Sequence, residues 1–205
     1  NIKQIDKVLI DLGVSSHQFD DYSRGFSFRE DASLDMRMNN LETKKTAKDI
    51  INSYSKKELS DIFYNFGELI HNKKLVENIS YFRKKKPIKT TNELCEIIKK
   101  SYFFSNNRKQ LIKTYSQVFQ ALRIEVNQEF EVLKNTLTLL SNFLNETSIV
   151  FIITFHSLED KLVKYHVKAS NNLYLSPKKV IKPSYEETKR NPRSRSAKGR
   201  VIRFK

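Results

Sequence analysis

A short run of strand-forming apolar residues ends in an acidic residue near the start of the chain, and this feature restricts the fold more than any other. Val8, Leu9 and Ile10 precede Asp11, and a polar stretch containing Gly13 follows. Continuous apolar runs of this kind predict a buried strand of an α/β sheet. Open α/β folds bind ligands at the carboxyl ends of their strands. We therefore expect a ligand-binding sheet edge that carries Asp11.

The next part of the chain changes from loop-like to helical sequence. Residues 13–40 have few periodic apolar positions and predict a long, structured loop. Residues 41–116 have helical periodicity throughout and predict an all-helical segment. Two capping boxes mark helix starts within it: Ser55 with Glu58, and Thr90 with Glu93.

The last part of the chain returns to mixed patterns. Residues 117–144 form a long amphipathic pattern, which predicts one bent helix or two. Residues 149–154 are β-branched or aromatic and predict a central parallel strand covered on both faces. A helix is expected from 158 to 167, a surface excursion over 170–199, and a final edge strand at 201–204.

This order of elements predicts an α/β fold that corresponds to the second half of a doubly wound sheet. We expect three parts: a core strand and active-site loop at 1–40, a helical insert at 41–116, and the rest of the core with a basic tail at 117–205. The sequence has four glycines and no G-x-G pattern. A nucleotide-type cofactor site needs a glycine-rich turn after its first strand, so the first half of such a fold is expected to be missing.

Composition narrows the class of partner. The chain has 38 lysines and arginines against 23 acidic residues, a net charge of +15. This excess favours nucleic acid as a partner, although an AT-rich genome that inflates lysine content explains it equally well. The single cysteine, Cys95, excludes a disulfide framework and is expected in the core. No apolar run has membrane-spanning length, so we expect a cytoplasmic protein with no membrane partner.

Separated blocks of sequence resemble the ribosomal RNA small-subunit methyltransferase H (MraW) family. The resemblance implies a partial class I (Rossmann-like) methyltransferase sheet with an inserted all-helical substrate-recognition domain. It implies methylation of the N4 amine of a cytosine in 16S rRNA, in the decoding region, with S-adenosyl-L-methionine as cofactor. The small-subunit rRNA or 30S subunit would be the partner. The matching blocks are 8–28 with 34–38, 119–129, 154–160 and 191–198.

Two departures from the family pattern matter. Family members carry a preceding segment with a glycine-rich cofactor loop, so the chain by itself is expected to be inactive. The family also has a His-Pro-Ala-Thr-Arg-like run where this chain has Lys113-Thr114-Tyr115-Ser116-Gln117. Any contact made by the usual arginine is then lost or replaced.

The resemblance implies that Asp11 and Gln18 contact the cofactor. A carboxylate accepts hydrogen bonds only, which suits a ligand with amine and hydroxyl donors and a positive sulfonium. The alternatives are that Asp11 caps the following turn and that Gln18 is an exposed loop amide.

Methylation of cytosine N4 needs an acceptor for an N–H, because the N4 lone pair is delocalised into the ring. The catalytic candidates are Asp11, with the backbone carbonyls after it, Asp35 and His156. A structural hydrogen bond is an equal alternative for His156. We expect Ser157 to cap a helix whose first turn contains Glu159 and Asp160. No metal is expected, because the sequence has no His/Cys cluster with ligand spacing.

Arginines and loop aromatics are the candidate RNA contacts, since arginine binds phosphate bidentately and aromatic faces stack on unpaired bases. For Arg24, Arg37 and Arg123, the alternative is an internal salt bridge to Asp20, Asp21 or Asp35. For the basic C-terminal tail, the alternative is solvated disorder. A non-catalytic RNA-binding or ribosome-associated helical protein is the alternative function. The candidates are Arg24, Phe26, Phe28, Arg37, Arg123, Arg193, Arg195 and Lys198.

Overall fold

The computed structural model describes residues 4–104 and 107–205, which form two compact units. The sheet unit combines Asn1–Gly13 with Phe130–Lys205, and the helical unit is the continuous segment Val14–Glu129. The functional division at 1–40, 41–116 and 117–205 is a different partition and stays a prediction.

The sheet unit contains a mixed four-stranded sheet in the order β1-β2-β4-β3. Strand β1 (Lys7–Asp11) pairs in parallel with β2 (Ile149–Thr154), and β2 pairs antiparallel with β4 (Lys198–Phe204). The expectation that residues 201–204 form an edge strand is therefore wrong, because β4 lies inside the sheet. Strand β3 (Leu173–Leu175) pairs with the other side of β4 and takes the edge. Three residues are too few to show a strand pattern in the sequence.

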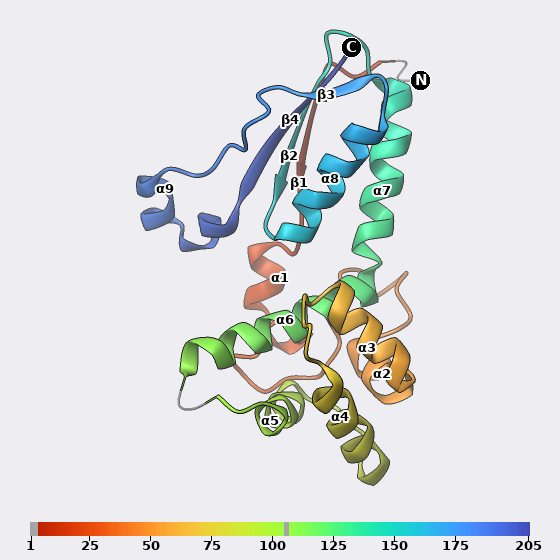
Figure 1. The fold of residues 1–205 in the computed structure, drawn as a ribbon, viewed down its shortest axis with the longest axis vertical. Coiled ribbons are helices and arrows are strands. Elements are labelled where there is room, and N and C mark those ends of the chain that lie inside the picture. The colour runs from red at the N-terminus through yellow and green to blue at the C-terminus, as the bar shows by residue number, and fades with distance from the viewer. Residues whose placement is uncertain (1–3, 105–106) are drawn as a thin grey trace. The chain divides into compact units, whose positions relative to one another are not determined.

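Helices cover one face of this sheet in the part of the chain that the structure describes. Helices α7 (Glu129–Leu140) and α8 (Ser157–Ala169) lie along the strands (Figure 1), and Leu137 and Val163 pack on Val150. Residues of β2 alternate between buried and half-buried, and Leu9 of β1 is 68% exposed. Residues 149–154 form a central strand as expected, but the expected cover on both faces is incomplete, because one face of β2 is only half-buried.

The helical unit has a separate hydrophobic core. Its helices are α1 (Ser16–Asp20), α2 (Ala47–Ser53), α3 (Lys56–Asn65), α4 (Lys73–Lys85), α5 (Thr91–Ser101) and α6 (Arg108–Asn127), seen in Figure 1. Both predicted capping boxes are present at the starts of α3 and α5. Cys95 is buried in this core, and burial raises the pKa of its thiol to about 12.

The amphipathic pattern over 117–144 forms two helices rather than one. Helix α6 ends at Asn127, and α7 begins at Glu129. Gln128 between them has φ of 50° and donates its N–H to the Ile124 carbonyl. This left-handed residue ends α6, as at many helix C-termini.

Short elements fill the rest of the described chain. The expected excursion over 170–199 contains β3, α9 (Tyr185–Arg190) and the 3-10 helix Pro192–Ser196. Further 3-10 turns lie at Tyr22–Arg24 and Ser141–Phe143. Within the described ranges, no helix combines the length and apolar character needed to cross a membrane.

Acid is expected to destabilise the sheet unit through His166 of α8. Its Nε2 is buried without a hydrogen-bond partner among the described residues, and this burial lowers the pKa of the ring, although a hydrogen bond with the Leu137 backbone opposes the shift. The stability that neutral His166 contributes is fully present above the ordinary histidine pKa, and it is lost as pH falls through the lower pKa of the folded state. We expect a slope of at most about 1.4 kcal/mol per pH unit from this group.

Urea unfolding as a function of pH measures this contribution. His166→Gln should flatten the acid side of the stability profile, whereas the same change at exposed His71 should not. Parallel profiles for the wild-type chain and the His166 variant would contradict the expectation.

Candidate functional site

Asp11 lies at the carboxyl end of β1, where its side chain is exposed. The register places Asp11 opposite Ile153 of β2, and Leu12 donates its N–H to the Ile153 carbonyl at 3.1 Å. Parallel pairing thus brings residues 11–13 beside residues 153–156. A Cβ built on Gly13 would meet only Phe155, at an ordinary van der Waals distance of 3.9 Å, so no described atom crowds this position.

His156 follows β2 directly and caps α8. Its Nδ1 accepts a hydrogen bond from the Glu159 N–H at 3.4 Å, and the Glu159 carboxylate accepts from the backbone N–H groups of Phe155 and His156. His156 rather than Ser157 is therefore the N-cap, which corrects the sequence expectation. The ring displaces serine from this role because its acceptor nitrogen already reaches the third residue of the helix.

The rest of the His156 ring is enclosed within the sheet unit. Its Nε2 lies 3.0 Å from Glu159 Oε1 but makes no hydrogen bond with described residues, and the Phe130 ring is 5.9 Å away. These contacts support the structural alternative for His156, and a catalytic role stays a prediction. The sheet unit therefore brings Asp11 and His156 to the same end of adjacent strands.

Gln18 belongs to the helical unit and completes a capping box at α1. Its Oε1 accepts from the Ser15 N–H at 3.0 Å, and its own N–H donates to Ser15 Oγ at 3.2 Å. Its Nε2 lies 3.5 Å from the Met38 carbonyl. The side chain is thus fixed by local contacts rather than free in a loop.

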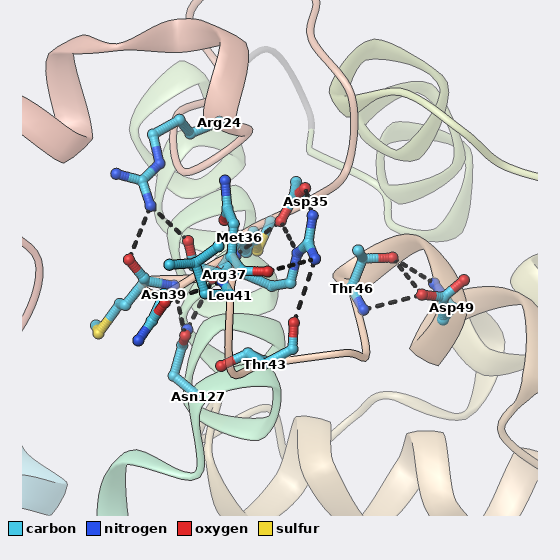
Figure 2. A network of polar contacts seen from close by, with 12 residues as sticks. Arg24, Asp35, Met36, Arg37, Asn39, Leu41, Thr43, Thr46, Asp49 and Asn127 are labelled. Atoms are coloured by element: carbon cyan, nitrogen blue, oxygen red, sulfur yellow. Dashed lines mark hydrogen bonds and ion pairs between the residues drawn. The ribbon is translucent and has the colours of Figure 1, made fainter.

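A network of polar contacts in the helical unit contains Asp35, Arg37 and Arg24 (Figure 2). Arg37 Nε donates to Asp35 Oδ1 and Arg37 Nη2 donates to Asp35 Oδ2, both at 2.7 Å. The hydrogen bonds from Arg37 hold the pKa of Asp35 below its ordinary value. Arg24 Nη2 donates to the carbonyls of Arg37 and Met38 at 2.7 and 3.0 Å. Both arginines therefore support the loop, as the salt-bridge alternative predicted for Arg37.

Asn127 at the end of α6 attaches the same loop to the helical core. Its side chain accepts from the Met38 N–H and donates to the Met36 carbonyl, both at 2.7 Å (Figure 2). Met36 is fully buried and has φ of 61°. A left-handed conformation is unfavourable for a bulky residue, so the polar contacts and the buried side chain stabilise this strained position together.

The loop aromatics pack inward. Phe26 is only 6% exposed and belongs to the hydrophobic core, with the Arg24 guanidinium 5.5 Å from its ring centroid. Phe28 is half-buried, and its ring lies 5.4 Å from that of Tyr115 and 5.3 Å from that of Phe119. Phe26 is thus a core residue in this structure, and Phe28 has an aromatic surface at the edge of the core.

Arg123 of α6 makes a bidentate ion pair with Glu129. The Nε–Oε1 distance is 2.8 Å and the Nη2–Oε2 distance is 3.0 Å. The partner is none of the three aspartates considered from the sequence. This pair engages two of the five N–H donors of the guanidinium and neutralises its charge, and a phosphate contact by Arg123 stays a prediction.

The C-terminal tail is ordered, and the disordered alternative is wrong. Arg193 and Arg195 lie on the 3-10 helix Pro192–Ser196, and Lys198 begins β4. Arg200 of β4 is buried, and its Nε and Nη2 donate to the two carboxylate oxygens of Asp160 of α8, at 2.8 and 3.2 Å. The exposed Arg195 and half-buried Lys198 remain candidate RNA contacts.

Comparison with known proteins agrees with the sequence resemblance. The model of the MraW methylase family matches residues 1–205. The chain belongs to the MraW methylase family.

Curated relatives in this family share close to half of their aligned residues with the chain. The protein named ribosomal RNA small subunit methyltransferase H in Bacteroides thetaiotaomicron is 46% identical over 220 residues, covering 100% of this chain and 71% of the relative. The proteins of the same name in Hydrogenobaculum sp. and Ehrlichia chaffeensis are 47% and 40% identical, covering 97% and 98% of this chain and 66% and 70% of the relatives.

Several residues that hold the site together in this MraW family member were missed by the sequence reasoning. Glu129 and Asn127 were not singled out, and Glu159 was expected only to favour the helix dipole. Asn127 contacts the distant backbone of Met36 and Met38, Glu129 pairs with Arg123 of the preceding helix, and Glu159 binds the backbone just before its own helix. Only the Glu159 contacts have a sequence signal, since an acceptor three residues after His156 forms a capping box.

Proposed function

We propose that the protein that contains this chain transfers a methyl group from S-adenosyl-L-methionine to the N4 amine of a cytosine in small-subunit rRNA. The family match over residues 1–205 carries this proposal, since the relatives with that match are named as small-subunit rRNA methyltransferases. The alternative of a non-catalytic RNA-binding protein is not favoured, because the match covers both the sheet unit and the helical unit.

The carboxyl end of β1 fits a cofactor of this kind. The Asp11 carboxylate is exposed there and has no hydrogen-bond partner among the described residues, and no described atom crowds the position beside Gly13. When bound, S-adenosylmethionine supplies an electrophilic methyl group on a positively charged sulfur. Asp11 would accept hydrogen bonds from its amine or hydroxyl groups, and Gln18 is the second proposed contact.

The chain's contribution to the reaction is to orient the cytosine amine. Backbone carbonyls after Asp11 can accept an N4 N–H, which fixes the direction of the nitrogen toward the methyl group. His156 and Glu159 fix the backbone at the end of β2 beside them. We propose His156 as a positioning residue, with Asp35 holding the loop at 35–43 through Arg37.

The substrate and location follow from the same proposal. The net charge of +15 suits a polyanionic substrate, and small-subunit rRNA or the 30S subunit is the proposed partner. Bacterial ribosomal RNA lies in the cytoplasm, and we therefore propose the cytoplasm as the location of this protein.

Nucleoside mass spectrometry of rRNA tests the proposed reaction. Cells that lack the gene should have no N4-methylated cytidine at the target position, and the gene returned on a plasmid should restore it. Unchanged N4-methylcytidine in the rRNA of the deletion strain would contradict the proposal.

The same assay tests Asp11. Asp11→Ala in the returned gene should weaken cofactor binding by about 10- to 100-fold, because a hydrogen bond to a charged group contributes about 1.5–3 kcal/mol. N4-methylcytidine should then fall at limiting cofactor. Asp6→Ala is the matched control, since Asp6 is an exposed acidic residue just before the same strand. Equal methylation by the two variants would exclude Asp11 as the cofactor contact.

A further inference from the structure

A cavity of about 780 Å³ lies within the helical unit, apart from the cofactor contact proposed at Asp11. The loop at 26–29 forms one wall, and helix α6 forms another. This volume falls in the range of about 300–1,000 Å³ that is typical of small-ligand sites. The cavity is therefore large enough for one nucleotide.

Aromatic side chains form much of the cavity wall. Phe26 and Phe119 are buried, whereas Phe28 and Tyr115 are half-buried and have their rings 5.4 Å apart. Tyr115 belongs to the segment where this chain departs from the family's usual run. Half-exposed aromatic rings beside a cavity can stack on an unpaired base.

The charge of the wall is entirely positive among the described residues. Arg29 and Arg108 are exposed, and neither has an ion-pair partner in the described ranges. Arg123 also lines the cavity, but Glu129 neutralises it. No carboxylate belongs to a described lining residue. Two available guanidinium groups beside aromatic rings favour a ligand with a planar apolar part and an anionic part.

We propose that this cavity binds one unstacked nucleotide of the RNA substrate. Its base contacts Phe28 and Tyr115, and its phosphates contact Arg29 and Arg108. The inference rests on the proposed function, because that function makes RNA the substrate. It adds a second nucleotide contact, within the helical unit, that the methyl-transfer chemistry does not require.

The chain has no tryptophan, so a single introduced indole reports on this cavity alone. Protein-free small-subunit rRNA is the probe. Tyr115→Trp should lose fluorescence on RNA binding, because a stacked base quenches the indole. Tyr64→Trp is the matched control, since Tyr64 is 56% exposed on α3 and does not line the cavity. Its emission should change little at the same RNA saturation.

Affinity measurements test the two halves of the cavity separately. Tyr115→Leu should weaken RNA binding by about 5- to 100-fold. Tyr115→Phe should bind RNA as tightly as the wild-type chain, because only the ring is needed for stacking. Arg108→Gln should reduce the slope of log affinity against log salt by about 0.7, the value for one phosphate contact on a single strand. Lys74→Gln on α4 should leave that slope unchanged.

The outcomes separate this inference from the proposed function. Equal responses of the two tryptophan variants, or wild-type affinity in both Tyr115→Leu and Arg108→Gln, would overturn the cavity assignment while RNA binding persists. A wild-type chain that fails to bind the rRNA contradicts the RNA substrate itself. Thermal melting of each variant identifies a folding defect, and the Tyr115→Trp result then decides the assignment.

Discussion

Asp160→Asn should lower the free energy of unfolding of the sheet unit by about 3–5 kcal/mol. The substitution leaves the Arg200 guanidinium buried without a counter-ion, although its hydrogen bond to the Lys178 carbonyl at 3.0 Å remains. Both side chains of the pair are only 9% exposed, so water cannot replace the lost carboxylate. Urea unfolding followed by far-ultraviolet circular dichroism measures the change.

A second substitution shows whether the unpaired charge is the cause. Adding Arg200→Met to Asp160→Asn should recover most of the lost stability, because a buried ion pair contributes little over an apolar pair of similar volume. Asp61→Asn is the surface control, since Asp61 pairs with Lys57 at 2.7 Å but both side chains are largely exposed. A single Asp160 variant as stable as the Asp61 control would contradict the prediction.

The Asp160–Arg200 pair also has a predictable pH dependence. Burial opposes ionisation of Asp160, but the hydrogen bonds and charge of Arg200 outweigh it and lower the pKa of the carboxyl. A lowered pKa in the fold means that the stabilisation is complete above the ordinary carboxyl pKa and is lost as pH falls through the lower folded value. The Asp160→Asn variant should therefore lose less stability in acid than the wild-type chain.

Gly25→Ala should destabilise the helical unit by about 2–5 kcal/mol, the sum of a left-handed alanine and a steric clash. Gly25 has φ of 72°, and an added Cβ would lie 2.1 Å from the Ser33 carbonyl oxygen. Backbone atoms cannot rotate away as a side chain can. The loop at 33–36 would have to move. This movement would also disturb the hydrogen bond from the Met36 N–H to the Arg24 carbonyl.

Gly13→Ala is the matched control for this prediction. Gly13 has φ of 92°, but an added Cβ there would meet only Phe155 at 3.9 Å. Its cost should be limited to backbone conformation, about 1–2 kcal/mol. Chemical denaturation of both variants provides the comparison. Equal losses would show that conformational strain alone, without the contact to Ser33, accounts for the Gly25 effect.

Local sequence signals predicted the longer helices well, whereas the short helices α1 and α9 lie in segments that were expected to be loops. The Ser55 and Thr90 capping boxes are satisfied by neighbouring residues, so their pattern is complete within one turn of helix. Pro87 lies just after the end of α4, since proline cannot continue a helix. The β1 and β2 runs were also found, since each is apolar over most of its length.

Features that depend on distant partners could not be predicted in the same way. The sequence of β4 has no signal for a position between β2 and β3, because strand order depends on pairing. Arg24 and Arg37 look like exposed basic residues, yet both stabilise the loop around Met36. The candidate site is therefore only partly predictable: Asp11 lies at a strand end as expected, and the capping boxes of Gln18 and His156 have local sequence signals that were missed, whereas the contacts of Arg24 and Asn127 depend on distant residues.

The order of the units along the chain affects how the protein folds during synthesis. The helical unit is continuous from Val14 to Glu129, but the sheet unit needs β2 before β1 has a parallel partner. Domains fold as units while the N-terminal part of a chain emerges first from the ribosome. The helical core is thus expected to form before β2 is available to pair with β1, whose Leu9 is exposed. Among the described strands, β1 has no pairing partner until β2 has been synthesised, and an unpaired strand edge can pair with another chain.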